Sequence, residues 1–430
     1  MKILSAWCVV LALTCGAALG QTYKVLWSFG SSPSDGASSV SNLIFDKAGN
    51  LYGTTQFGGS ATNLQCGNGG GCGTVFELSP NADGTWTNNI IYNFCANYSG
   101  SCLDGQQPTA GLAMDAAGNL YGTTYFGGPG CGNASAGCGT VFELSPPQSS
   151  GDPWTETVLY LFCSLNNCLD GVFPNSHLTF DGSGNLYGTT TGGGAGAWYG
   201  GTVFELSPNA GPWIETVLYN FCVGGRFHHC PDGTYPQAAV TFDHTGNLYG
   251  TTETGGTPSG GGGGTLFALT PTANGWSEST LYAFNPASGI GGLFGVVSLD
   301  SVGDLYSTSC GGGQSHGGTV FRFNPKGKTM RAASLASGGG ACPTAGIVID
   351  ETAGAGYGTA SSGFTKDSGG TVFKFGSSGE ETVLYTFCQL QNCADGYAPQ
   401  ASLILHDGNL YGTTEKGGAL GYGVVFEITP

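Results

Sequence analysis

Residues 184–190 read Gly-Asn-Leu-Tyr-Gly-Thr-Thr, and residues 201–206 read Gly-Thr-Val-Phe-Glu-Leu. Both phrases are short, rich in Thr, Tyr, Val and Phe and bounded by glycine, which is typical of β-strands. Both recur along the chain. The first phrase is intact in five copies and altered in two, with its tyrosine at Tyr52, Tyr121, Tyr187, Tyr249, Tyr306, Tyr357 and Tyr411. Repetition at this spacing predicts an array of equivalent strand units.

Two further phrases complete the repeating unit. Thr-Val-Leu-Tyr-x-Phe, as around Tyr160, follows the Gly-Thr-Val-Phe-Glu-Leu phrase, and Asp-Gly-x-x-Pro-x-Ala-x-Leu, as in 104–112, precedes the next tyrosine. We name the strands A (Ala-x-Leu), B (Leu-Tyr-Gly-Thr-Thr), C (Thr-Val-Phe-Glu-Leu) and D (Thr-Val-Leu-Tyr-x-Phe). Seven four-stranded units in one chain predict an all-β fold, a seven-bladed β-propeller.

The two ends of the repeat array predict how the ring closes. The chain after residue 20 opens with a D-like strand, 22–29, and finishes on a C strand, 424–429. The last unit lacks a D strand and the N-terminal segment supplies one, so the N-terminal strand is expected to complete the last blade. We expect one propeller domain over residues 21–430.

Residues 1–20 have the pattern of a secretory signal peptide. Lys2 is followed by an apolar stretch and then by Ala18-Leu19-Gly20 before Gln21. A membrane anchor would need about 20 apolar residues, so cleavage is the favoured interpretation. The mature chain is expected to be secreted, extracellular or periplasmic, with no membrane span. No surface anchor is visible after the last strand, which favours release.

Composition excludes several classes of function. Charged residues make up 9% of the chain and the formal net charge is −17. An acidic chain repels phosphate backbones and anionic lipids, so nucleic acid is not an expected partner. The scarcity of Glu, Lys and Arg also argues against long solvent-facing helices. We expect a monomer.

Sixteen cysteines occur in the chain, and two of them leave with the signal peptide. The remaining even number in an exported protein favours disulfides over zinc, which needs four ligands in recurrent pairs even though His228 and His229 precede Cys230. Six pairs are close in sequence and the seventh follows by elimination. The expected pairs are Cys66 with Cys72, Cys95 with Cys102, Cys131 with Cys138, Cys163 with Cys168, Cys222 with Cys230, Cys388 with Cys393, and Cys310 with Cys342.

The alternation of strand direction sorts the loops onto two faces. The B-to-C loops and the loops from D to the next A share one face, and all fourteen cysteines fall there or at its strand ends. The opposite face is built from tight turns. Loops that vary in length and are stiffened covalently suit a recognition surface.

The phrases Gly-Asn-Leu-Tyr-Gly-Thr-Thr, Gly-Thr-Val-Phe-Glu-Leu and Asp-Gly-x-x-Pro resemble the GloVer tandem-repeat family of exported bacterial proteins. The resemblance covers essentially all of the chain after the signal peptide. It implies an exported repeat protein whose function is not established. A fainter likeness of Asp-x-x-Gly-Asn-Leu-Tyr to NHL-type propellers, some of them lyases or lactonases, is an analogy of fold.

Repeated Asp-Gly pairs precede the inner strands. A ring of carboxylates at the channel mouth would offer the oxygen ligands that Ca²⁺ prefers, whereas the alternative is that each carboxylate closes its own turn. Repetition favours the turn. Calcium is thus the sole cofactor candidate, with Asp104, Asp170, Asp232 and Asp395 as its potential ligands.

One cluster interrupts the repeat and is our candidate binding site. Aromatic residues lie in the B-to-C loop of the third unit, and aromatic and basic residues lie in the D-to-A loop that follows. The cluster comprises Trp198, Tyr199, Arg226, Phe227, His228 and His229. Stacking rings beside Arg and His would suit a glycan or a peptide. The alternative is that Trp198 and Tyr199 fill a gap between blades.

Two common catalytic motifs are absent from the sequence. Neither a His-Glu-x-x-His motif nor a phosphate loop occurs. Carboxylates recur in strand C, and a pair of carboxylates can serve a glycosidase, but residues repeated in equivalent positions are better explained as structural: Glu77, Glu143, Glu205 and Glu427. We expect a secreted, non-catalytic binding module for an extracellular glycan or envelope protein. The alternative is an extracellular lyase or glycoside-cleaving enzyme that uses the central channel.

Overall fold

The computed structural model describes residues 21–32, 34–61, 66, 70–96, 101–129, 136–149, 151–196, 200–225, 229–257, 262–285, 291–313, 316–335, 340–363, 369–376 and 379–430. The signal segment, 1–20, lies outside them. The regular structure in these ranges is β-strand, with short 3₁₀ turns such as η2 (Asn166–Cys168) and η4 (Gln391–Cys393). No helix in them is long and apolar enough to span a bilayer.

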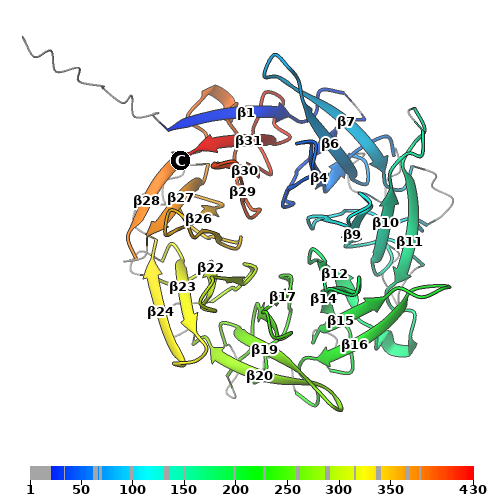
Figure 1. Ribbon diagram of the computed structural model, residues 1–430, viewed down its shortest axis with the longest axis vertical. Helices are drawn as coiled ribbons and strands as arrows, with labels where there is room; N and C mark the ends of the chain where they lie inside the picture. The colour runs from blue at the N-terminus through cyan, green and yellow to red at the C-terminus, as the bar shows by residue number, and fades with distance from the viewer. Residues whose placement is uncertain are drawn as a thin grey trace, which may run out of the picture.

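The strands form seven blades around a ring, so the predicted propeller is confirmed (Figure 1). From strand A to strand D, blades 1 to 3 are β3 (Ile44–Phe45), β4 (Leu51–Thr55), β6 (Thr74–Pro80), β7 (Trp86–Asn93); β8 (Ala113–Met114), β9 (Leu120–Thr124), β10 (Thr140–Ser145), β11 (Thr155–Leu161); and β13 (Thr179–Phe180), β14 (Leu186–Gly192), β15 (Thr202–Ser207), β16 (Ile214–Asn220).

Blades 4 to 7 continue the same order around the ring. They are β17 (Thr241–Phe242), β18 (Leu248–Thr252), β19 (Thr265–Thr272), β20 (Gly275–Ala283); β21 (Ser298–Leu299), β22 (Leu305–Ser309), β23 (Thr319–Asn324), β24 (Thr329–Ser334); β25 (Val348–Asp350), β26 (Ala355–Ala360), β27 (Thr371–Gly376), β28 (Glu381–Thr386); and β29 (Ile404–His406), β30 (Asn409–Thr413), β31 (Val424–Thr429), β1 (Thr22–Ser28). Extra short strands depart from the four-stranded plan: β12 (Val172–Pro174) adds to blade 3, and β2 (Gly36–Ala37) pairs with β5 (Phe57–Gly58).

Both ends of the chain build blade 7. β1 pairs antiparallel with β31, from Thr22 opposite Thr429 to Ser28 opposite Val424, and Figure 1 shows the two strands side by side. Directly after β1, the ring of Phe29 packs 5.2 Å from that of Phe76 in blade 1. The N-terminal strand therefore completes the last blade, as the sequence predicts, and the residue that follows it contacts the first blade.

The glycine of the Tyr-Gly-Thr-Thr phrase makes room for the phenylalanine of strand C. Gly250 lies opposite Phe267 in the β18–β19 pair, and a Cβ on Gly250 would come within 2.5 Å of the ring. The same close approach occurs at Gly53, Gly122, Gly188, Gly358 and Gly412. The ring thus lies flat on strand B, which explains why the two phrases recur together. Blade 5 departs from this pattern, with Ser307 opposite Phe321.

The blades are joined by pairs of phenylalanine rings. Phe221, at the end of strand D in blade 3, packs 5.1 Å from Phe267 on strand C of blade 4, and both are fully buried. Equivalent pairs at 5.0 to 5.2 Å are Phe29–Phe76, Phe94–Phe142, Phe162–Phe204, Phe284–Phe321 and Phe387–Phe426. Between blades 5 and 6, Leu335 takes the place of the first ring against Phe373.

The turn between strands A and B is closed by an aspartate. Asp181 Oδ1 accepts hydrogen bonds from the backbone N–H of Ser183 and Asn185, at 2.8 and 2.9 Å. Burial opposes ionisation, but these bonds and those from the Asn185 and Tyr187 side chains lower the pKa of Asp181. The Tyr187 hydroxyl also donates to Glu205 at 3.0 Å. The strand C glutamate is therefore bonded within its own blade, which fits a structural role.

Buried glutamates face aspartates between the blades. Burial and the charge of Asp170 raise the pKa of Glu215 to about 8, and burial with a neighbouring aspartate raises that of Glu156 to about 7. Oε1 of each glutamate is buried without a hydrogen-bond partner. At the equivalent position of blade 1, Asn88 Nδ2 donates to Asp35 at 3.0 Å. A protonated glutamate could supply the same kind of donor, and the raised pKa of each glutamate increases its protonated fraction near neutral pH.

The predicted disulfides are formed where both cysteines are described. They are Cys66–Cys72, Cys95–Cys102, Cys163–Cys168, Cys222–Cys230, Cys310–Cys342 and Cys388–Cys393. Cys138 is disulfide-bonded, and Cys131 lies outside the described residues. All of the described cysteines lie in B-to-C loops, D-to-A loops or at their strand ends. We call this side of the ring the disulfide face.

Phe221→Ala tests the ring pairs between blades. Truncating a buried phenylalanine leaves a cavity, so the free energy of unfolding should fall by about 3–5 kcal/mol. Ile214→Ala in the same blade is the control, because that side chain is 53% exposed and its loss should cost less than about 0.5 kcal/mol. Urea unfolding followed by tryptophan fluorescence measures both. Similar losses in the two variants would contradict the role of the pair.

The buried glutamates predict that stability falls as the pH rises from about 6.5 to about 8. A carboxyl whose folded pKa exceeds its unfolded value stabilises fully below the unfolded pKa, and this contribution is lost as the pH rises through the folded pKa. His177 acts in the opposite sense, because burial lowers its pKa from 6.5 to about 4, but its effect ends near pH 6.5.

Thermal midpoints across this pH window measure the effect. Glu215→Gln should flatten the decline, because an amide can donate to Asp170 at any pH. Glu351→Gln, at an exposed glutamate, should leave the slope as it is. An unchanged slope in Glu215→Gln would refute the assignment of the proton to this interface.

Candidate functional site

A cavity of about 670 Å³ occupies the centre of the ring and is lined by all seven blades. Its wall is the phrase Pro-x-Ala-x-Leu. The two x positions face the cavity, because alternate residues of an extended chain point the same way. The first x positions are Val40, Thr109, Asn175, Gln237, Phe294, Thr344 and Gln400, and the second are Asn42, Gly111, His177, Ala239, Val296, Gly346 and Ser402.

The rim of this cavity on the disulfide face is built by the same backbone contact in successive blades. The residue after the Thr-Thr pair donates its N–H to the carbonyl of the residue that precedes proline, as in Tyr125 to Gln107 and Glu253 to Tyr235, both at 3.1 Å. The residue before proline has a positive φ, 58° at Phe173 for example. Since the conformation recurs around the ring, it belongs to the fold, and only the side chains it presents differ between blades.

One sector of the rim, just outside the residues that line the cavity, is aromatic. The rings of Tyr125 and Phe173 stack at 5.2 Å, and Phe126 meets each of them edge-on, at 4.7 and 5.6 Å. These residues come from blades 2 and 3. Across the ring, the residues before proline are small, with Cys342 in blade 6 and Ala398 in blade 7. The rim therefore breaks the sevenfold repeat on one side.

A chain of polar side chains crosses the same blades next to the aromatic sector. Thr109 Oγ1 donates to Asn175 Oδ1 at 2.5 Å, Asn175 Nδ2 donates to Gln237 Oε1 at 3.1 Å, and Gln237 Nε2 donates to Glu253 Oε2 at 2.5 Å. Burial raises the pKa of Glu253, although the bond from Gln237 opposes that rise. Burial raises the pKa of Tyr125, and the negative charge of Glu253 raises it further. The carboxylate therefore lies close enough to the aromatic sector to act on it electrostatically.

Deeper in the cavity, His177 marks a polar belt. Asn42 Oδ1 accepts from the Ser402 N–H at 2.9 Å, and Asn42 Nδ2 lies 3.4 Å from His177 Nδ1. Gly111 lets Asn42 pass in front of blade 2, since a Cβ there would lie 3.0 Å from Asn42. Enclosure by the blades lowers the pKa of His177 to about 4. The imidazole is therefore neutral at ordinary pH and can accept a proton or a hydrogen bond.

The aspartates considered as calcium ligands anchor the D-to-A loops. Asp170 Oδ2 accepts from the Tyr160 hydroxyl at 2.9 Å and from the Ser164 N–H at 2.8 Å. A strand D tyrosine and a loop N–H serve the same purpose at Asp104, Asp232 and Asp395. Among the described residues, the close groups of three or more possible metal ligands consist of disulfide cysteines. Calcium at these positions stays a prediction.

The cluster predicted from the interrupted repeat falls mostly outside the described residues. Trp198, Tyr199, Arg226, Phe227 and His228 lie there, while His229 is described and exposed. The loops that carry the cluster begin next to each other, because a Cβ on Gly196 would lie 2.1 Å from the carbonyl oxygen of Phe221. Both loops belong to the disulfide face at blade 3.

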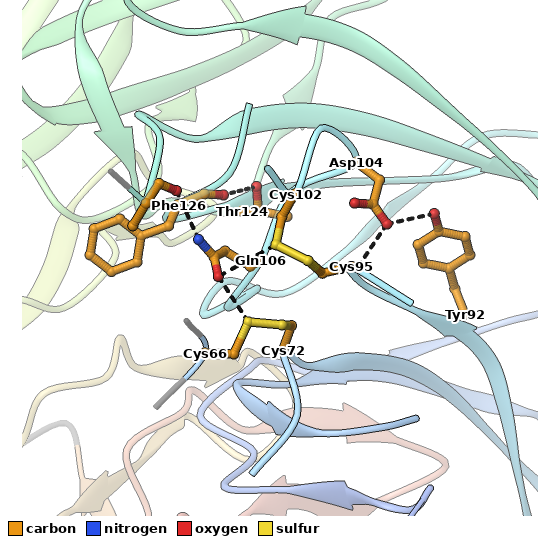
Figure 2. Close-up of a disulfide and its surroundings, with 10 residues drawn as sticks. Cys66, Cys72, Tyr92, Cys95, Cys102, Asp104, Gln106, Thr124 and Phe126 are labelled. Atoms are coloured by element: carbon orange, nitrogen blue, oxygen red, sulfur yellow. Dashed lines mark hydrogen bonds between the residues drawn. A yellow bond between two sulfur atoms is a disulfide. The ribbon is translucent and has the colours of Figure 1, made fainter. Parts of the chain in front are cut away.

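Disulfides pack against each other behind the rim in blade 1. Figure 2 shows Gln106 between Cys66–Cys72 and Cys95–Cys102, with its Oε1 2.9 Å from the Cys66 sulfur. Its amide donates to the carbonyl of Ala136 at 2.8 Å, which ties the loop of blade 1 to that of blade 2. The loop segment that ends at the rim is thus held on two sides.

Sequence reasoning missed the aromatic sector and the polar chain. Tyr125, Phe173 and Gln237 occupy variable positions inside the repeated phrases, so each one alone resembles packing. A signal was present in the position of these residues within the repeat. When the seven copies are aligned, the residue after Thr-Thr and the residue before proline change from blade to blade. One of these two positions is aromatic in each of blades 2 to 4.

Comparisons with known proteins agree with the fold. A family model described as Gloeobacter/Verrucomicrobia repeat matches residues 62–298 and 295–430. A search of curated proteins finds no match. The chain is similar to an ulvan lyase, a polysaccharide lyase, with a TM-score of 0.56 at 10% identity over 93% of this chain and 94% of that chain. It is also similar to a candidate 6-phosphogluconolactonase from Bacteroides fragilis, with a TM-score of 0.50 at 15% identity over 85% and 94%. At these identities the likeness shows the fold alone.

Removing the disulfide between blades should cost more than removing one within a loop. Cys310 and Cys342 are 32 residues apart, whereas Cys163 and Cys168 are 5 apart. Loop-closure entropy predicts losses of about 4 and about 2 kcal/mol for the paired serine variants. Guanidinium unfolding of both double variants compares them. The reverse order would contradict a closing role for the Cys310–Cys342 bridge.

Proposed function

The chain belongs to the Gloeobacter/Verrucomicrobia repeat family, and from this premise we propose that it is an exported, non-catalytic binding propeller that holds a glycan at the mouth of its central cavity. The disulfides support export, because such bonds persist in oxidising compartments. The signal-like pattern of residues 1–20 supports it as well.

The juxtaposition of the aromatic sector and the polar chain carries this proposal. Tyr125 and Phe173 stack at the rim, and the chain that ends at Gln237 and Glu253 begins in the same blades. A sugar ring has an apolar face of C–H groups and an edge of hydroxyls. Aromatic rings suit the face, and amide and carboxylate groups suit the edge.

The rigid rim backbone supports the interpretation of the aromatic sector as a binding site. The rim backbone is fixed by repeated hydrogen bonds, and the disulfide face limits loop motion, so little order must be gained on binding. The cavity of about 670 Å³ is also in the size range of small-molecule and oligomer sites. Residues needed only for packing would recur in every blade, whereas Tyr125 and Phe173 do not.

The cluster around Trp198 is proposed as a second contact region on the same face. Its two loops begin beside each other at blade 3, the blade that also supplies Phe173. Trp198, Tyr199 and Phe227 would extend the stacking surface outward from the mouth. An envelope protein is the competing ligand for this region, and a protein ligand would need no contact with the cavity.

His177 favours an enzyme as the second candidate. An unprotonated imidazole in a cavity has the form that a general base requires, although the lowered pKa of His177 makes it a weak base. The similar ulvan lyase is a protein of this fold that acts on a polysaccharide. In a lyase, the base removes a proton next to a carboxylate and the glycosidic bond breaks as a double bond forms. Incubation with acidic polysaccharides, followed by absorbance of the unsaturated product, tests this reaction, and His177→Gln would abolish it.

Tyr125→Ala tests the binding function directly. Loss of a stacking aromatic anchor should weaken glycan binding tenfold or more, about 1.4 kcal/mol. Tyr422→Ala is the matched control, since it removes an exposed tyrosine from the same face in blade 7. Affinity electrophoresis in gels that contain plant or bacterial polysaccharides measures both. Equal retardation of the two variants would argue against the rim, and Trp198→Ala would then show whether the outer region binds alone.

A further inference from the structure

We propose that the mouth of the cavity accepts uncharged glycan chains and rejects polysaccharides that carry carboxylate or sulfate groups. This inference rests on the glycan-binding function proposed above and names the class of its ligand. It is carried by the described side chains that line the cavity and form the polar chain, whose polar groups are neutral or negative.

The cavity wall offers no cationic side chain to an anionic ligand. Among the described residues that line it, the charged one is Glu415. The nearest lysine in sequence, Lys416, already pairs with Glu415 at 3.0 Å. Carboxylates and sulfates are recognised in proteins mainly through Arg, Lys or several converging N–H groups. Neither Arg nor Lys is among the described residues that line this wall.

The hydrogen bonds of the polar chain all run in one direction and end at a carboxylate. Each member donates toward Glu253, through Asn175 and then Gln237. The groups left over for a ligand are therefore a hydroxyl lone pair, spare amide N–H groups and the second oxygen of Glu253. Sugar hydroxyls can donate to that oxygen, whereas a carboxylate or a sulfate can only repel it.

Glu253 is poorly placed to tolerate a second negative charge. Its side chain is partly buried, and burial already raises its pKa, which means that its charge is incompletely solvated. A ligand anion would be brought into the same low-dielectric site, where Coulomb repulsion is stronger than in water. The formal charge of −17 adds a repulsive field at low ionic strength.

Binding to polysaccharides of matched size and different charge tests the inference. The probes are a neutral β-glucan, a neutral mannan, a polyuronate and a sulfated galactan, each titrated by calorimetry in low salt and in 0.5 M salt. At least one neutral polymer should bind ten or more times tighter than either acidic polymer in low salt. Salt should reduce this difference in affinity between neutral and acidic polymers, because it screens repulsion between charges near the surface.

Glu253→Gln should narrow this difference in affinity further, since it removes the negative charge at the end of the polar chain and keeps an acceptor oxygen. Asp152→Asn is the matched control: it makes the same charge change at an exposed turn between strands C and D, on the opposite face. The gap should be unchanged in that variant.

The failures of the two proposals are distinguishable. Tighter binding of an acidic polymer that is lost in Tyr125→Ala would overturn the charge inference and keep the glycan site. An equal gap in Glu253→Gln and the wild type would also overturn it. Absence of binding to every polymer would overturn the proposed function and this inference together.

Discussion

The contact between the last phenylalanine of one blade and the strand C phenylalanine of the next is the constraint on which the structure depends. Phe221 is buried by Phe267 of blade 4, so the core of blade 3 is incomplete without its neighbour. Phenylalanine pairs join the other blades in the same way, except that Leu335 takes the place of the first ring between blades 5 and 6. Phe29 supplies the partner of Phe76 only because β1 is paired with β31. Closure is therefore a packing requirement, since an open array would expose a phenylalanine surface at one end.

Because the repeated positions are committed to this packing, variation is confined to positions that the fold does not use. The residue after Thr-Thr and the residue before proline contribute backbone hydrogen bonds to the rim, and these are the same whether the side chain is Tyr125 or Ser361. Their side chains are free to differ. An aromatic sector can then appear in blades 2 and 3 without a cost to the blades themselves.

The fold was predictable because its determinants are local and occur seven times. Gly250 opposite Phe267, the aspartate turns and the short Cys-Cys loops can each be recognised within one copy. The site was not predictable in the same way. Tyr125 and Phe173 are 48 residues apart, as their numbers show, and their stacking depends on how two blades are placed side by side. The cluster around Trp198 attracted attention because it interrupts a glycine loop, a signal that says nothing about what lies across the ring.

The negative charge of the chain comes both from aspartates that anchor loops and from carboxylates at the mouth of the cavity, and only the second group would act on a ligand. Aspartates such as Asp170 and Asp395 are fully buried and accept hydrogen bonds from the loops that they anchor. Their charge belongs to the architecture. Screening limits the reach of any charge to about 8 Å at physiological salt, so a ligand at the mouth responds to Glu253 and Glu415 far more than to the total. In the proposed glycan site, specificity for charge would thus depend on these two side chains, while the repeat supplies the negative background on which they act.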